Sequence, residues 1–362
     1  MFNSIYHGKK VLVTGHTGFK GSWLCSFLRL LGAEVCGIAL PPETPLSHWQ
    51  LLDIPMPSLE IDIRDREKLI AAVKDFQPEF LFHLAAQPIV RYSYEIPAET
   101  FDTNVMGTVN ILEACRQTPS LRSAVIITSD KCYENREQLA GYTENDPMGG
   151  FDPYSASKGC AELVVSSYRR SFFHPDNYGK SHHLLLASAR AGNVIGGGDW
   201  AKDRLVPDIM QAAAKGEPAL IRNPLATRPW QHVLEPLSGY LLLGQKLYEG
   251  DISAASPWNF GPAADGVINV QTACAMLQGA WEKISFEIAP VAGQPHEAKL
   301  LTLDCSKAEK LLRWHGVFSA EEMFGFTSQW YKEFYTDGKV ITAEQLAAYL
   351  DLAEKRNLSW MN

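Results

Sequence analysis

The chain carries an acid, two amines, a phenol and a hydroxyl at two neighbouring places in its sequence. Ser129, Asp130 and Lys131 close an apolar segment, and Tyr154 and Lys158 follow within the motif Tyr-Ser-Ala-Ser-Lys. Around one bound redox cofactor, these groups could remove a hydride, abstract a carbon-bound proton, expel water and return the hydride. The sequence therefore indicates an enzyme that combines oxidation and elimination at one site.

A dinucleotide site is expected near the start of the chain, where an apolar strand runs into a glycine-rich turn and then an apolar helix. The predicted cofactor-binding residues of this turn are Gly15, Thr17, Gly18, Phe19, Lys20 and Gly21. Glycine permits a tight turn and close approach to a pyrophosphate, which the free N–H groups of the helix N-terminus attract. An ordinary glycine-rich turn is the alternative, but the position after the first strand of an alternating β/α chain favours the dinucleotide site.

The residues alone leave the choice between NAD and NADP open. An NAD site usually has an acidic residue at the end of the second strand, where it binds the adenosine ribose hydroxyls. Here that strand runs into Pro41 and Pro42, the nearest carboxylate is that of Glu43, and no arginine stands there to attract a 2′-phosphate.

Tyr154 and Lys158 are four residues apart, so a helix places them on the same face. A tyrosine has a pKa of about 10, and a nearby ammonium together with a positive nicotinamide would lower it enough for the phenol to act as a base. Lys158 could also bind the nicotinamide ribose. A solvated helix with an unrelated Tyr and Lys is the alternative, but the glycine turn favours the catalytic interpretation.

Further candidates fall where strands of the predicted sheet end. Asp62 and Ile63 could contact adenine, although Asp62 could equally be a turn carboxylate that starts a helix. Asn104, a polar residue in an apolar helix, could fix water or backbone near the reaction centre. Small residues at the end of the fourth strand would let backbone lie against the cofactor, although they could equally serve packing alone. The residues expected at this strand end are Leu84, Ala85, Ala86 and Gln87.

These groups must be positioned by a sheet whose strands end near one another. Strands are expected at residues 11–14, 34–39, 59–61, 80–84, 124–128 and 184–189, with helices between them. The alternation predicts an α/β fold with a Rossmann-type doubly wound parallel sheet over residues 1–190 and a return segment at about 230–260. Glycine, proline and tryptophan then accumulate, which predicts a smaller mixed α/β substrate lobe at 191–229 and 261–362.

The composition is typical of a soluble enzyme. The chain has 362 residues, 46% of them hydrophobic, and a net charge of −8. An excess of positive charge, which binding to nucleic acid or to an anionic membrane would favour, is therefore not present. No apolar run approaches the roughly 20 residues of a membrane helix and no cleavable signal is visible, so we expect a cytoplasmic protein. The seven cysteines are scattered, which indicates reduced thiols, and no spacing suggests a metal site.

Several of these motifs together resemble the extended short-chain dehydrogenase/reductase superfamily that acts on nucleotide sugars. They lie at residues 15–21, 83–87, 103–105, 154–158 and 190–194. Within it, residues 128–133, 228–233 and 296–298 closely resemble the CDP-glucose 4,6-dehydratases of bacterial lipopolysaccharide synthesis, and the match runs from about residue 8 to beyond residue 310. Similar dTDP-glucose dehydratases carry Thr-Asp-Glu in place of Ser-Asp-Lys, so that tripeptide is the most specific element.

The resemblance implies NAD as the cofactor, a CDP-hexose as the substrate, and an internal redox cycle in which C4 loses a hydride that returns to C6. Tyr154 would remove the C4 hydroxyl proton and Ser129 would hydrogen-bond the C4 oxygen. Lys131 would take the C5 proton, and Asp130 would protonate the departing C6 hydroxyl. The implied substrate-binding residues are Gln87, Asn104, Arg190, Asn193, Arg204, Arg228 and His296. Arginine suits a diphosphate because its planar fork is bidentate, but Arg204 could equally be a surface residue.

The roles of Asp130 and Lys131 stay open, because these roles require a neutral acid beside a neutral amine. In water the pair would be a carboxylate and an ammonium, and moving the proton costs roughly six pK units, or about 9 kcal/mol. A closed, water-poor cleft would reduce that cost. The reverse roles would use the ground state directly but conflict with the positions that the resemblance implies.

Two other functions share most of these features. A nucleotide-sugar 4-epimerase would have no use for Asp130 and Lys131, and a non-catalytic dinucleotide-binding scaffold would have no use for Tyr154 and Lys158. The helices expected at 98–116 and 154–170 carry apolar residues on more than one face. In similar enzymes the corresponding helices pair across a two-fold axis as a four-helix bundle, so we expect a homodimer.

Overall fold

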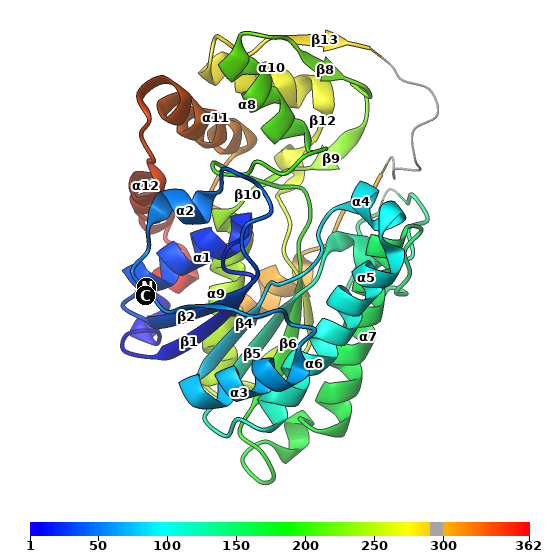
Figure 1. Ribbon diagram of the computed structural model, residues 1–362, viewed down its shortest axis with the longest axis vertical. Helices are drawn as coiled ribbons and strands as arrows, with labels where there is room; N and C mark the ends of the chain where they lie inside the picture. The colour runs from blue at the N-terminus through cyan, green and yellow to red at the C-terminus, as the bar shows by residue number, and fades with distance from the viewer. Residues whose placement is uncertain (139, 290–299) are drawn as a thin grey trace.

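The larger lobe is built on one seven-stranded parallel sheet in the computed structural model, which describes residues 1–138, 140–289 and 300–362 (Figure 1). From edge to edge its strands are β11 (Pro257–Asn259), β6 (Leu185–Arg190), β5 (Ser123–Ile127), β4 (Phe80–His83), β1 (Lys10–Thr14), β2 (Glu34–Ala39) and β3 (Ser58–Glu60). The strand order reverses direction between β1 and β4, and ligands of such sheets bind at this point beyond the carboxyl ends. The predicted Rossmann-type fold is confirmed.

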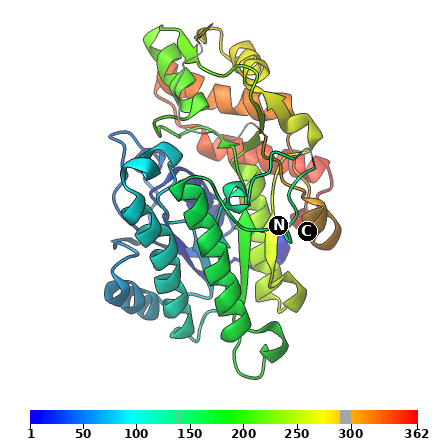
Figure 2. The same cartoon turned by 90° about the vertical axis from the view of Figure 1, so that its right-hand side faces the viewer.

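Helices cover both faces of the sheet because alternate strand residues face opposite sides. In β1, Val11 and Val13 pack in the core that includes α1 (Phe19–Leu30) and α9 (Leu234–Tyr248). The residue between them, Leu12, packs in a second core with α3 (Arg66–Phe76), α6 (Gly107–Arg116) and α7 (Pro153–Ser171). Figure 2 shows α7 along the outside of this second layer, beside α6. The central strands β1, β4, β5 and β6 are therefore mostly apolar and buried on both faces.

The structure adjusts several predicted boundaries. Six strands lie within one residue of their predicted positions at each end, whereas β11 was not predicted as a strand. The helix expected at 98–116 consists of α5 (Pro97–Phe101), a π-helical turn (Asp102–Met106) and α6. A second π-helical turn lies over Ala308–Leu312.

The smaller lobe combines helices with three two-stranded sheets, which agrees with the mixed α/β character expected for it. The strand pairs are β7 (Val194–Ile195) with β10 (Gln231–His232), β9 (Thr227–Pro229) with β12 (Val267–Asn269), and β8 (Ala219–Ile221) with β13 (Phe286–Ile288). The helices of this part are α8 (Leu205–Lys215), α10 (Val270–Ala280), α11 (Ala320–Asp337) and α12 (Thr342–Lys355). Figure 1 shows α8 and α10 above the carboxyl ends of the sheet.

Two short helices, α2 (His48–Leu52) and α4 (Val90–Glu95), lie on opposite sides of the molecule between the sheet and the smaller lobe (Figure 1). The two termini meet, and Asn3 donates its backbone N–H to the carbonyl of Asn362 at 2.8 Å. All seven cysteines are free. Within the described residues no helix is long and apolar enough to cross a membrane.

Candidate active site

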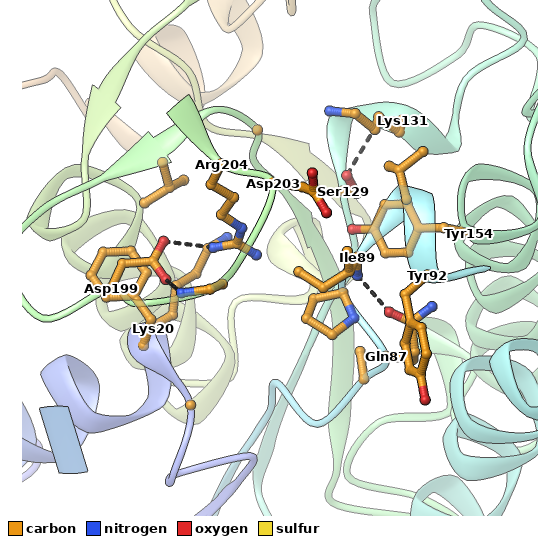
Figure 3. A pocket seen from close by; sticks show the side chains of 18 of the residues that line it. Lys20, Gln87, Ile89, Tyr92, Ser129, Lys131, Tyr154, Asp199, Asp203 and Arg204 are labelled. Atoms are coloured by element: carbon orange, nitrogen blue, oxygen red, sulfur yellow. Dashed lines mark hydrogen bonds and ion pairs between the residues drawn. The ribbon is translucent and has the colours of Figure 1, made fainter. Parts of the chain in front are cut away.

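A cavity of about 1450 Å³ opens between the carboxyl ends of the strands and the smaller lobe. A single small-molecule site usually occupies roughly 300–1,000 Å³, so this cavity has room for two ligands. Its walls include the glycine turn, the ends of β4 and β5, the start of α7 and the segment that leads into α8. Figure 3 shows Ser129, Lys131 and Tyr154 on one side, facing Lys20, Asp199 and Arg204 on the other.

The glycine turn has the geometry of a dinucleotide cradle. Gly15 has a φ of +74°, and a Cβ there would lie 2.6 Å from the backbone nitrogen of Ala85. A Cβ on Gly21 would lie 2.1 Å from the carbonyl oxygen of Gly15, so helix and turn touch backbone to backbone. Gly18 is the N-cap of α1, whose first N–H groups have no partner within the helix and point out as anion donors. These residues fit a dinucleotide pyrophosphate.

All the predicted cofactor residues line this cavity. They are Gly15, Thr17, Gly18, Phe19, Lys20, Gly21, Asp62, Ile63, Leu84, Ala85, Ala86, Tyr154 and Lys158. Glu43 also lines it, and the Thr17 hydroxyl donates to the Leu40 carbonyl at 2.9 Å at the end of β2. Arg64 binds Asp62 through two nitrogens, at 2.6 and 3.0 Å, and this pairing lowers the pKa of the Asp62 carboxyl.

The acid–base segment is a single turn of 3₁₀ helix (Asp130–Cys132) at the end of β5. Ser129 caps it by accepting from the N–H of Lys131 at 3.2 Å, and its hydroxyl donates to Oδ1 of Asp130 at 2.9 Å. Asn193 donates to Oδ2 of Asp130 at 3.3 Å, and the Lys131 ammonium lies 3.6 Å from Oδ1. The Asp130 side chain is only 1% exposed, whereas that of Lys131 is 31% exposed and reaches into the cavity.

Helix α7 brings the tyrosine and lysine pair to this segment. Asp152 caps the helix by accepting from the N–H of Ser155 at 2.9 Å, and Pro153 suits the first helical position. Tyr154 and Lys158 are then both buried, at 8% and 6% exposure, on the cavity side of the helix.

Burial shifts the pKa values of Tyr154 and Lys158 toward their uncharged forms. Burial raises the pKa of Tyr154, although a hydrogen bond with Ser129 and the charge of Lys131 oppose the rise. Burial also lowers the pKa of Lys158 to about 8, and the charge of Glu162 opposes that fall. The protein alone therefore does not prepare the phenol as a base, and further positive charge at the nicotinamide position is needed.

The opposite wall carries charges that the sequence analysis only partly found. Arg204 binds Asp199 at 2.8 Å and lines the cavity, so it is not a plain surface arginine. Lys20 lies in the same region, and its pKa falls to about 7 because it is buried and faces Arg204, Lys158 and Lys131. Asp199 was missed, and only its place in a Gly-Gly-Gly-Asp-Trp loop could have singled it out.

Asn104 does not line the cavity, which does not fit the substrate-binding role that the resemblance implied, but it does fix backbone, the other role expected for it. Its amide accepts from the N–H of Gln87 at 2.8 Å and donates to the Gln87 carbonyl at 3.1 Å. It also donates to the Ser157 hydroxyl at 2.8 Å. Gln87 itself lines the cavity, with its side chain bound to Thr100. Asn104 therefore holds the loop after β4 against α7.

Arg190 is also corrected, because the structure does not bring it to the cavity. Its side chain is 3% exposed and forms an ion pair with Glu162 at 2.8 Å behind the acid–base segment. A direct contact with substrate diphosphate is therefore not supported. Asn193 and Arg228 line the cavity as predicted, while His296 lies outside the described residues.

Residues 12–325 match the family model described as GDP-mannose 4,6 dehydratase. The chain belongs to this family. It is 50% identical over 331 residues to a CDP-glucose 4,6-dehydratase of Salmonella typhimurium (strain LT2), covering 91% of this chain and 92% of that relative. The resemblance stated from the motifs is thus confirmed. A dTDP-glucose 4,6-dehydratase of Neisseria meningitidis serogroup B is 27% identical over 357 residues, or 89% of this chain and 93% of the relative.

Solved structures of nucleotide-sugar epimerases share the fold of this 4,6-dehydratase family member. The UDP-glucose 4-epimerase of Thermus thermophilus, solved with NAD, superposes with a TM-score of 0.76 at 24% identity, covering 89% of this chain and 99% of the epimerase. At this identity the likeness concerns the fold alone.

Proposed function

We propose that the protein is an NAD-dependent CDP-D-glucose 4,6-dehydratase, a hydro-lyase that forms CDP-4-keto-6-deoxy-D-glucose and water. The observation that carries the proposal is the meeting of residues 129–131 with Tyr154 and Lys158 in one cavity. The 50% identity to a CDP-glucose 4,6-dehydratase over most of both chains supports the choice of substrate. The room for two ligands supports a dinucleotide beside a nucleotide sugar.

The glycine turn and the ends of β2 and β4 would hold NAD, with Lys158 placed to bind the nicotinamide ribose. Bound there, NAD would supply the hydride chemistry, as acceptor at C4 of the sugar and as donor at C6. The Lys158 ammonium adds positive charge to the nicotinamide side of the cavity, where it favours the phenolate form of Tyr154.

The chain's own residues then supply the proton transfers. Tyr154 takes the proton of the C4 hydroxyl, and the Ser129 hydroxyl turns from Asp130 to donate its one proton to the C4 oxygen. The resulting ketone makes the C5 proton acidic, and Lys131 removes it. Asp130 gives a proton to the C6 hydroxyl, so that the C6–O bond breaks and water leaves. A proton then returns to C5, and the net loss is one water.

The surroundings of Asp130 bear on which group is the acid. Its two oxygens accept hydrogen bonds from Ser129 and Asn193, which fix the orientation of the carboxyl group. The Lys131 ammonium lies 3.6 Å from Oδ1 of Asp130, so a proton has only a short path between the two groups. We assign Asp130 as the acid and Lys131 as the base, with closure of the water-poor cleft supplying the shift from ion pair to neutral pair.

The proposal is tested by incubating the purified protein with NAD and CDP-glucose that carries deuterium at C4. We expect a product lighter by one water, with the deuterium recovered in the new C6 methyl group. An epimer of unchanged mass would indicate a nucleotide-sugar 4-epimerase instead. Failure to turn over any nucleotide sugar would indicate a non-catalytic dinucleotide-binding protein.

We also propose that the protein is a homodimer that works in the cytoplasm. Four large apolar side chains are exposed on one group of helices: Phe101 on α5, Met106 on the π-helical turn, Leu163 on α7 and Phe172 at the end of α7. A second copy of the same surface would cover them. Helices α6 and α7 lie side by side, which supplies two of the four helices of a bundle (Figure 2). The seven free cysteines suit a reducing compartment.

A further inference from the structure

The proposed reaction depends on two segments that belong to different elements and must keep a fixed position relative to each other. Tyr154 and Lys158 are fixed by the backbone of a 19-residue helix that has its own N-cap. Asp130 and Lys131 lie on one turn of 3₁₀ helix after a strand, and so short a segment holds its shape only through its neighbours. Something must therefore tie the short segment to the helix.

Glu162 ties the near side of the segment. It lies one turn after Lys158 on α7 and is almost fully buried. One carboxylate oxygen accepts from the Thr128 hydroxyl at 2.5 Å, and the other accepts from the Ser188 hydroxyl at 2.8 Å. Thr128 directly precedes Ser129 in the chain. The carboxylate of Glu162 thus fixes the end of β5 against α7.

Arg190 ties the far side of the segment. One guanidinium nitrogen binds Glu162 at 2.8 Å, and another donates to the Tyr133 hydroxyl at 2.6 Å. The guanidinium also lies 4.9 Å from the centre of the Tyr133 ring. Tyr133 is the C-cap of the 3₁₀ turn and donates onward to Asn259 of β11 at 2.7 Å. Both ends of the acid–base segment therefore meet one buried ion pair.

Burying two charges is expensive, and replacing such a pair with neutral groups is often neutral or stabilising. Global stability is therefore a weak reason for this pair to be here. Neither residue lines the cavity, so neither touches substrate. The pair instead fixes the orientation of its neighbours. The carboxylate binds the hydroxyls of Thr128 and Ser188, and the planar guanidinium binds the phenol of Tyr133.

We infer that Glu162 and Arg190 are positioning residues that hold Asp130 and Lys131 against Tyr154 and Lys158, so that elimination at C5 and C6 follows oxidation at C4. The inference rests on the proposed function. Removing the pair loosens the short segment more than it loosens α7. Oxidation at C4 therefore persists while elimination slows, and reduced nicotinamide accumulates on the enzyme.

The test compares wild type with Glu162→Gln and with the double variant Glu162→Gln/Arg190→Gln. The single variant leaves the Arg190 charge unpaired and could fail to fold, whereas the double variant removes both charges. A misplacement of about 1 Å costs about 100-fold in rate, so we expect dehydration of CDP-glucose to fall by about that factor. We expect the near-ultraviolet absorbance of reduced nicotinamide to build up in the same variants during a single turnover.

Glu235→Gln is the matched control, because Glu235 is also a buried carboxylate. It accepts from the backbone N–H groups of Val317 and Phe318 and does not line the cavity. We expect this variant to lose thermal stability, with wild-type dehydration per folded molecule and no build-up of reduced nicotinamide.

The outcomes separate this inference from the function on which it rests. Dehydration by the double variant at the wild-type rate, or a slower dehydration with no build-up of reduced nicotinamide, would overturn the positioning role alone. A build-up in Glu235→Gln would overturn it as well, since the signal would then reflect general loosening. A wild-type protein that forms neither reduced nicotinamide nor a dehydrated product would overturn the proposed function and this inference with it.

Discussion

Replacing Gly192 with alanine tests the position of the proposed acid through a single methyl group. A Cβ at Gly192 would lie 1.9 Å from Oδ2 of Asp130 and 2.0 Å from its carboxyl carbon. Since real contacts start near 3.0 Å, the carboxylate or the glycine backbone must move by about 1.1 Å, the difference between 3.0 and 1.9 Å. A displacement of about 1 Å costs about 100-fold in rate, which corresponds to about 2.7 kcal/mol of activation free energy.

The assay measures steady-state dehydration of CDP-glucose and of its analogue with fluorine in place of the C6 hydroxyl. Fluoride leaves without a proton from an acid, so we expect the loss in Gly192→Ala to shrink on the fluoro analogue. Gly325→Ala is the control, because Gly325 lies in α11 with no atom near its Cβ position. That control should keep wild-type activity and gain roughly 0.5–1 kcal/mol of stability, as alanine does in a helix interior.

Two results would refute this reasoning. Wild-type activity in Gly192→Ala would mean that the position of the Asp130 carboxylate does not matter. An equal loss on both substrates would mean that the methyl group disturbs something other than protonation of the leaving group.

Three other perturbations address the acid, the buried lysine and the dimer surface. Asp130→Asn should lose dehydration of CDP-glucose and recover on the C6-fluoro analogue, measured by product formation; no recovery would favour Lys131 as the acid. Burial lowers the pKa of Lys158 from its ordinary 10.5 to about 8, so the folded protein gives up this proton more readily than the unfolded chain does. The wild-type free energy of unfolding should therefore gain a few kcal/mol from this group as pH rises from 8 to 10.5, and Lys158→Met should lack that gain in denaturant titrations. Parallel pH curves for the two proteins would contradict it. Leu163→Asp should shift the protein toward monomer in light scattering, because this side chain is 60% exposed on α7 where the second copy is proposed to bind; an unchanged mass would argue for another interface.

The large sheet was predictable because its signals are local. Strands buried on both faces need unbroken apolar runs, and the first one meets a turn that only glycine can make at Gly15. Strand β11 is not predictable in this way, because its three residues, which include Pro257 and Asn259, form no apolar run. It becomes a strand only because β6 offers it an unpaired edge, which is information held elsewhere in the chain.

The site was predictable where its residues follow one another and not where they pair across the fold. Tyr154 and Lys158 share a helix face by spacing alone, and both reach the cavity. The resemblance implies that Arg190 binds substrate, and nothing near Arg190 in the sequence reveals that its partner is a buried carboxylate. Glu162 lies 28 residues earlier, on α7, and only the packing of that helix on β6 brings the two charges together.

The position of β11 at the edge of the large sheet makes the two halves of the molecule inseparable. The chain builds six strands, leaves to form β7 to β10, returns with α9 and β11 to complete the sheet, and then departs again. A fragment cut after residue 190 would lack α9 and would present β6 as a bare edge that invites association with other chains. Residues 1–190 alone should accordingly not form a stable monomer, because the sheet needs β11 at its edge and α9 on one face.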